Sequence, residues 1–149
     1  MSYRHLQELA SVRAEFEAVR LATSHLELTW TRLTDILRRG TVEIAHVREA
    51  ARNLEMTYII RLFSDFEGLL YRHLVARHPR LRIPRTAEAL LNRVALRERI
   101  PDPIREAAHA VREYRNSRVH QKSEPAREMT LQNANAALNR FLACLPDLP

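Results

Sequence analysis

The chain has 149 residues, of which 46% are hydrophobic and 28% are charged, a length and balance that suit one domain with a sizeable core. No apolar run approaches the roughly 18 to 20 residues that cross a bilayer, and segment 1–10 is too polar for a signal peptide. We therefore expect a cytoplasmic protein. Its single cysteine, Cys144, excludes an internal disulfide and a zinc site built on several thiolates.

The charge balance is strongly basic. The formal net charge is +6, and every basic residue except Lys122 is an arginine. A basic chain suits polyanionic partners such as nucleic acids, and the arginine-rich segment 77–85 could steer a phosphate backbone. The same pattern also fits codon composition and a solvated surface. Charge alone therefore leaves nucleic-acid binding open.

Apolar periodicity predicts a long first helix over residues 3–39, with Gly40 as its C-terminal stop. One stripe repeats every three or four positions, which is typical of a helix packed nearly parallel to its neighbours. The stripe consists of Leu9, Val12, Phe16, Val19, Thr23, Leu26, Trp30, Leu33 and Leu37.

A second long helix is predicted over residues 42–77, with an interruption or kink at Asn53. Beyond Asn53 its apolar face is wide, which indicates a central helix that is covered on more than one side. Gly68 lies inside this helix, where glycine costs about 1 kcal/mol relative to alanine. We interpret it as a point where another helix approaches closely, with a ligand site as the alternative.

Three further helices are predicted over residues 87–99, 102–120 and 130–145, separated by loops at 78–85, 100–101 and 121–127. Thr86 and Thr130 are expected N-caps, and Asp102 before Pro103 is a strong helix start. No segment shows the alternation of a strand. The sequence therefore predicts an all-α protein built as a helical bundle.

The end of the fourth predicted helix carries the residues with the most chemical potential. At about 100° per residue, Arg115 falls near the middle of the apolar face, while Asn116 and His120 share a face rotated from it. Arg112 and His109 lie on that same side. Arg115 and His120 can converge because the arginine side chain is long and the helix is expected to end near His120. A guanidinium can hold a phosphodiester, and an imidazole can move a proton near neutral pH.

The spacing Arg115-Asn116-x-x-x-His120 at the end of one helix, the Phe66-Glu67-Gly68-Leu69-Leu70 segment in the preceding long helix and a final amphipathic helix together resemble the HEPN family. These are small helical domains named for higher eukaryotes and prokaryotes nucleotide-binding. The resemblance covers most of the chain and implies a single domain over 1–149, folded as an antiparallel up-and-down bundle of four to five helices. Many members are metal-independent endoribonucleases that act as dimers, with the two motifs meeting in a cleft.

The resemblance also implies roles for individual residues. Arg115 becomes the phosphate-binding group, Asn116 the polar residue that orients it, and His120 the general acid or base. Glu67 and Arg112 are candidate supporting residues; Glu67 could pair with Arg115, or it could be an ordinary surface residue. No cofactor or metal is implied, and the expected partners are RNA, a second copy of the chain, and an antitoxin or regulatory protein.

Two alternatives remain open at this stage. Other HEPN domains have lost catalysis and bind nucleotide, nucleic acid or protein, which predicts salt-dependent binding without turnover. A purely structural bundle is the second alternative, with helix 3–39 as its assembly surface. In that case Arg115 extends its charged end to solvent from the edge of the core, and His120 suits a helix C-terminus as a cation.

Overall fold

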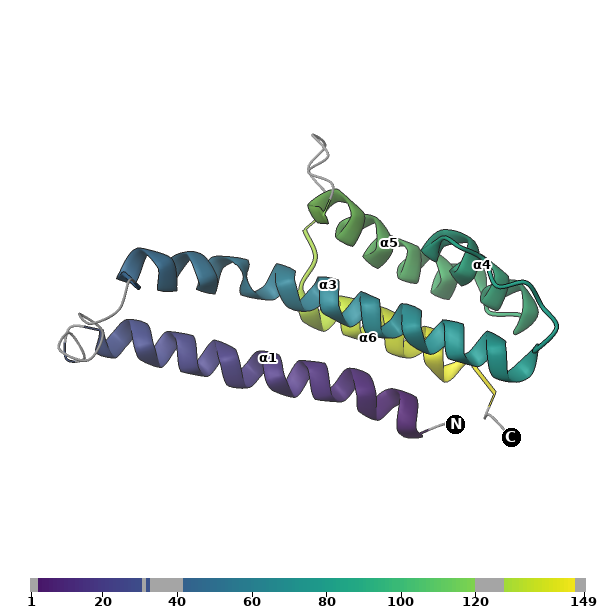
Figure 1. The fold of residues 1–149 in the computed structure, drawn as a ribbon, viewed down its shortest axis with the longest axis horizontal. Coiled ribbons are helices and arrows are strands. Elements are labelled where there is room, and N and C mark those ends of the chain that lie inside the picture. The colour runs from purple at the N-terminus through teal and green to yellow at the C-terminus, as the bar shows by residue number, and fades with distance from the viewer. Residues whose placement is uncertain (1–2, 31, 33–41, 120–127, 147–149) are drawn as a thin grey trace.

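The computed structural model describes residues 3–30, 32, 42–119 and 128–146. Within these residues the chain forms helices and no strands, which confirms the all-α prediction (Figure 1). The helices are α1 (Tyr3–Thr29), α3 (Ile44–Arg77), α4 (Ala87–Arg97), α5 (Asp102–Val119) and α6 (Leu131–Ala143). None of these helices combines the length and apolar character that a bilayer crossing requires.

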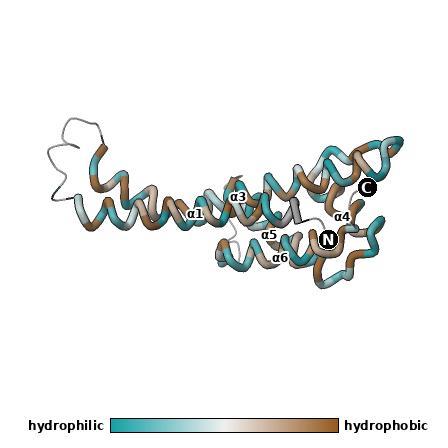
Figure 2. Tube along the Cα trace, turned by 90° about the horizontal axis from the view of Figure 1, so that it is seen from below, coloured by the Kyte–Doolittle hydropathy of each residue, from teal (hydrophilic) through white to brown (hydrophobic). Residues whose placement is uncertain are grey.

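Helix α3 is the centre of the bundle, because it packs against α1, α4, α5 and α6. Its C-terminal half supplies the largest buried side chains, including Phe63 and Phe66. The Phe66 ring meets Phe141 of α6 edge to face, with 5.4 Å between ring centroids, the geometry that aromatic quadrupoles favour. Helix α1 and the N-terminal half of α3 extend beyond the other helices as a two-helix arm (Figures 1 and 2).

The apolar stripe of α1 is used inside the molecule. Leu9, Val12 and Phe16 are buried, and the Phe16 ring lies edge to face against Tyr58 of α3 at 5.5 Å. The first part of the stripe therefore packs on α3, whereas its later described residues are half-buried, namely Val19, Thr23, Leu26 and Trp30. The predicted continuation of this helix, residues 33–39 with the Gly40 stop, lies outside the described residues.

The predicted interruption at Asn53 is wrong, since α3 continues through this residue without a break; the alternative of a kink there stays a prediction. The Asn53 side-chain amide donates to Glu49 Oε1 at 2.9 Å, and the Thr57 hydroxyl donates to the Asn53 carbonyl at 2.9 Å. Asparagine disrupts helices when its side chain competes for the backbone. Here the Asn53 side chain donates to the Glu49 carboxylate one turn earlier. It therefore does not compete for the backbone, and the helix continues.

The interpretation of Gly68 as a point of close helix approach is also wrong. A Cβ atom placed on Gly68 would have one neighbouring side chain, that of Arg72, whose Nη1 would lie 3.7 Å away. That is ordinary van der Waals separation, so no helix presses on this position. Gly68 instead lines a surface groove.

The predicted N-caps of α4 and α6 are confirmed. Thr86 Oγ1 accepts a hydrogen bond from the Ala89 amide at 3.2 Å, and Thr130 Oγ1 accepts from the Asn133 amide at 3.1 Å. Each bond satisfies an amide that has no partner within its helix. These caps fix where α4 and α6 begin.

The end of α4 depends on an unusual backbone conformation. The helix ends at Arg97, two residues before the predicted end, and Arg99 has a φ of 54°. The Ile100 amide donates to the Ala95 carbonyl at 2.9 Å, which completes a Schellman-type C-cap. This position normally holds glycine, because a Cβ atom disfavours the left-handed region.

We predict that Arg99→Gly stabilises the protein. Removing the Cβ atom relieves the left-handed backbone, which outweighs the greater freedom of glycine in the unfolded chain, for a net gain of about 0.5–1 kcal/mol. Urea unfolding of Arg99→Gly and of Arg99→Ala measures this gain. Arg99→Ala keeps a Cβ atom and should show no gain; an equal gain in both variants would contradict the prediction.

Candidate functional site

Arg115 lies on the inner side of α5, as its spacing predicts. The same side of the helix carries Ala108 and Val111, which are fully buried. The Arg115 residue is half-buried, and its Nη1 donates to Asn116 Oδ1 at 2.9 Å. This hydrogen bond links the two side chains, and the orienting role that the HEPN resemblance implies for Asn116 stays a prediction.

The buried edge of the Arg115 guanidinium is unsatisfied. Its Nε atom is shielded from solvent and has no hydrogen-bond partner, and no carboxylate among the described residues forms an ion pair with Arg115. A buried donor without an acceptor costs roughly 1–3 kcal/mol. Because Nε is shielded from solvent, an anionic acceptor such as a phosphate oxygen would meet the outer Nη groups of this half-buried guanidinium, whose planar fork matches phosphate geometry.

His120, the predicted general acid or base, lies outside the described residues. Helix α5 is described to Val119. The convergence of His120 with Arg115 therefore stays a prediction.

Arg112 is engaged elsewhere. Its side chain is 14% exposed, and its Nη1 lies 3.2 Å from Glu88 Oε2 of α4. Its Nε donates to Nδ1 of His109, one turn earlier on α5, at 3.2 Å. These contacts brace α5 against α4, so any support that Arg112 gives to the site is through positioning.

His109 completes this link between α4 and α5, and the sequence analysis did not anticipate its role. Because Nδ1 accepts from Arg112, Nε2 carries the proton and donates to Asn92 Oδ1 at 2.8 Å. Burial and the positive charge of Arg112 lower the pKa of His109 below its ordinary value of 6.5. The spacing of His109 three residues before Arg112 was the available signal.

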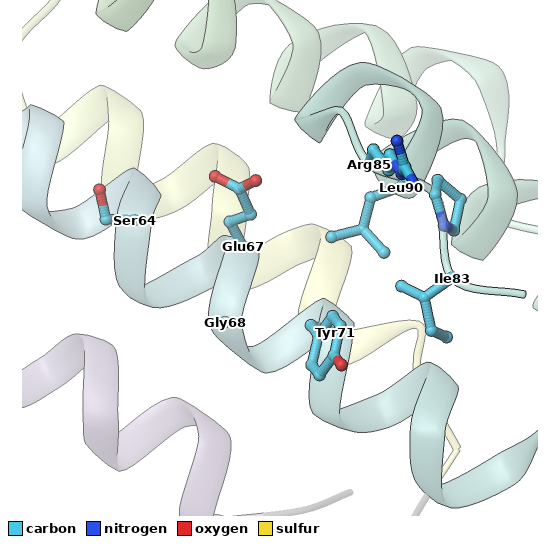
Figure 3. A pocket seen from close by; sticks show the side chains of 8 residues that line it. Ser64, Glu67, Gly68, Tyr71, Ile83, Arg85 and Leu90 are labelled. Carbon is cyan, nitrogen blue, oxygen red and sulfur yellow. The ribbon is translucent and has the colours of Figure 1, made fainter. Parts of the chain in front are cut away.

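Glu67 does not pair with Arg115 in the described structure. The Glu67 side chain is half-buried and rises from α3 beside a groove of about 610 Å³ (Figure 3). The groove is lined by Ser64, Glu67, Gly68, Tyr71, Ile83, Pro84, Arg85 and Leu90. It lies between α3 and the segment that leads into α4.

Two further side-chain contacts are not predicted by the sequence pattern. His73 is fully buried in α3, and its Nε2 lies 2.8 Å from Oε1 of Glu98 at the end of α4. In the last turn of α5, the Arg118 guanidinium lies over the Tyr114 ring, 5.2 Å from its centroid. Neither pair was identified from the sequence, although Tyr114 and Arg118 are four residues apart, the spacing at which helical side chains meet.

Two asparagines of α6 form a further unanticipated polar feature. Asn135 and Asn139 are half-buried, and the Oδ1 atom of each is buried without a partner. Their four-residue spacing beside the apolar stripe of α6 was the available signal.

Within the described residues, no group of three or more His, Cys, Asp or Glu side chains is arranged to hold a metal ion. Comparison with protein-family models, with curated proteins and with solved structures finds no match to this chain.

We predict that His109 makes the protein less stable in mild acid. Below about pH 6.5 the unfolded chain protonates this imidazole, whereas folded His109 resists protonation because its pKa is lowered. The stability that neutral His109 contributes is therefore complete above pH 6.5, and it declines as the pH falls toward the lowered pKa of the folded state. Between pH ~7.5 and pH ~5.5, the melting temperature should fall less for His109→Gln than for the wild type.

His25→Gln, which changes an exposed histidine, serves as the matched control for this series. It should retain the wild-type pH dependence. An identical fall for His109→Gln and His25→Gln would contradict the assignment of this acid sensitivity to His109.

We also predict opposite stability effects for two neighbouring arginines. Arg115→Met removes a buried donor that has no partner, so the free energy of unfolding should stay constant or rise by about 1 kcal/mol. Arg112→Met breaks contacts to Glu88 and His109 and should lower it by about 1–3 kcal/mol. Urea unfolding checks both values; equal losses would show that Arg115 is a structural residue.

Proposed function

We propose that this protein is a metal-independent endoribonuclease of the HEPN type, acting in a toxin or phage-defence role. The observation that carries the proposal is the Arg115 guanidinium, which lies on the inner side of α5 with its Nε buried and without an acceptor. Natural proteins retain such a group where it serves function at the expense of stability. The proposed acceptor is a phosphate of single-stranded RNA.

In the proposed reaction, an imidazole takes the proton of a ribose 2′-hydroxyl, and the oxygen attacks the adjacent phosphorus. The bond to the 5′-oxygen of the next nucleotide breaks, leaving a 2′,3′-cyclic phosphate on one product and a 5′-hydroxyl on the other. His120 is the proposed general acid or base. Arg115 stabilises the charge on the phosphoryl oxygens, and Asn116 holds Arg115 in place.

The charge of the α5 C-terminal turns supports this proposal. No acidic side chain among the described residues is paired with Arg115 or with Arg118, whereas Arg105 and Arg112 are paired with acids. The uncompensated guanidinium groups therefore lie in the last two turns of α5, next in the chain to His120. Phosphate contacts of this kind make binding strongly salt-dependent.

The proposed enzyme acts as a homodimer in which two motifs form one composite cleft, and an antitoxin or regulator controls it. A dimer supplies two His120 side chains, so that one can act as base while the other acts as acid. Exposed apolar residues on the outer face of α1, Leu21 at 60% and Leu28 at 82% exposure, provide one surface where partners could bind.

Cleavage of labelled single-stranded RNA tests this function. We expect wild-type protein to leave 2′,3′-cyclic phosphate ends, and His120→Ala to lower the rate about 10²–10⁴-fold. Arg115→Ala should lower it about 10²–10³-fold, while the matched control His25→Ala retains wild-type activity. Growth inhibition on expression should likewise disappear with His120→Ala.

Intact RNA after incubation with wild-type dimer over a range of salt and pH would contradict the ribonuclease proposal. Saturable, salt-dependent RNA binding that is weakened by Arg115→Ala but not followed by cleavage would instead identify a non-catalytic HEPN module.

A further inference from the structure

We infer that the groove between α3 and the segment before α4 is a base-recognition subsite that selects guanine in single-stranded RNA. This inference rests on the proposed ribonuclease function and adds a substrate preference to it. The groove of about 610 Å³ lies within the range of ligand pockets. Its lining combines polar and apolar side chains. This combination suits a flat ring with hydrogen-bonding groups at its edge.

Glu67 supplies an unused carboxylate at this groove. The side chain is half-buried, yet no hydrogen bond or ion pair within the described residues engages its carboxylate. This is notable in a chain of net charge +6, where many carboxylates pair with arginine. The Ser64 hydroxyl beside it donates to the Ile60 carbonyl at 3.1 Å, so its lone pairs can accept from a ligand.

The remaining walls provide surfaces for a ring and for a phosphate. Tyr71 is 51% exposed and lines the groove one helical turn after Glu67, and Ile83 lines it from the segment before α4 (Figure 3). An exposed aromatic ring of this kind is a stacking platform for unpaired bases. Arg85, at the rim, has no carboxylate partner among the described residues and can contact the phosphate of the bound nucleotide.

Gly68 keeps the floor of the groove open. A Cβ atom at this position would meet only the Arg72 guanidinium, at 3.7 Å, so packing within the protein does not require glycine. Glycine in a helix interior nevertheless costs about 1 kcal/mol relative to alanine. A ligand that lies flat against bare helix backbone accounts for it.

The hydrogen-bonding capacity of Glu67 identifies the base. An ionised carboxylate only accepts hydrogen bonds, so the base edge must present donors. Guanine offers two adjacent donors, N1–H and the N2 amino group, which match the two carboxylate oxygens. Adenine and cytosine each present one amino group next to an acceptor, and uracil presents a single N–H. A bidentate contact therefore favours guanine.

The groove and the α5 motif belong to two helices that pack against each other. Glu67 points away from α1 and toward the side of α3 that α4 and α5 cover (Figure 3), and α3 packs directly against α5. In the inferred complex, the reactive phosphate binds at Arg115 and a base of the same strand binds in the groove of α3.

Binding of RNA that cannot be cleaved tests this inference separately from catalysis. Fluorescent 2′-O-methyl hexamers lack the attacking hydroxyl; one carries a single guanine among uracils, and the other an adenine at the same position. We expect wild-type protein to bind the guanine hexamer about tenfold more tightly by fluorescence anisotropy, consistent with the discrimination that a bidentate base contact provides.

Glu67→Gln should reduce this ratio to about one, because an amide presents one donor and one acceptor and matches both purines. The matched control Glu106→Gln removes the same charge from an exposed position of α5 outside the groove and should retain the preference. Tyr71→Ala should weaken binding of both hexamers, while Tyr71→Phe keeps the ring and should bind as wild type does.

A guanine preference that survives Glu67→Gln, or wild-type protein that binds both hexamers equally, would overturn the subsite. Cleavage of the guanine hexamer and the adenine hexamer with free 2′-hydroxyl groups, measured in parallel, separates the two proposals. Guanine selection without cleavage would support the subsite and reject the ribonuclease, whereas cleavage without base selection would reject the subsite alone. Binding of an arginine-containing peptide in place of guanine would also overturn it.

Discussion

The packing of other helices around α3 is the constraint on which the rest of the structure depends. Phe63 and Phe66 are buried side chains of α3, and Phe141 of α6 packs against Phe66. Helix α5 packs against α3 with one of its sides, and Arg115 lies on that side. The position of its guanidinium is thus a consequence of core packing, and the proposed phosphate site depends on that position.

The polar groups of α5 divide according to their partners. Arg112 and His109 are satisfied by Glu88 and Asn92 of α4, so they hold the two helices together. Within the described residues, Arg115 forms a hydrogen bond to its neighbour Asn116 and leaves Nε without an acceptor. A side chain of the first kind contributes to stability, whereas the unsatisfied donor of Arg115 supports the proposed phosphate contact. This difference separates the structural part of α5 from the proposed site.

Local chemistry determined which features could be predicted from the sequence. The caps at Thr86 and Thr130 and the inward position of Arg115 follow from interactions within a few residues, and the structure contains them. Asn53 and Gly68 were misjudged because Glu49 occupies the asparagine side chain and no helix approaches the glycine. The pairing of His73 with Glu98, and the groove beside Glu67, join segments far apart in the chain. The spacing of apolar residues along the sequence does not reveal contacts between such distant segments. The role of His120 stays a prediction.

The central claim is that the Arg115 guanidinium binds an RNA phosphate, and its own NMR signal tests this most directly. In ¹H–¹⁵N spectra of the arginine Nε groups, the Arg115 resonance is assigned by its loss in Arg115→Lys. We expect titration with 2′-O-methyl RNA to move this resonance in a saturable way, while that of Arg112 stays in place. An Arg115 resonance that remains fixed while RNA saturates the protein would contradict the claim.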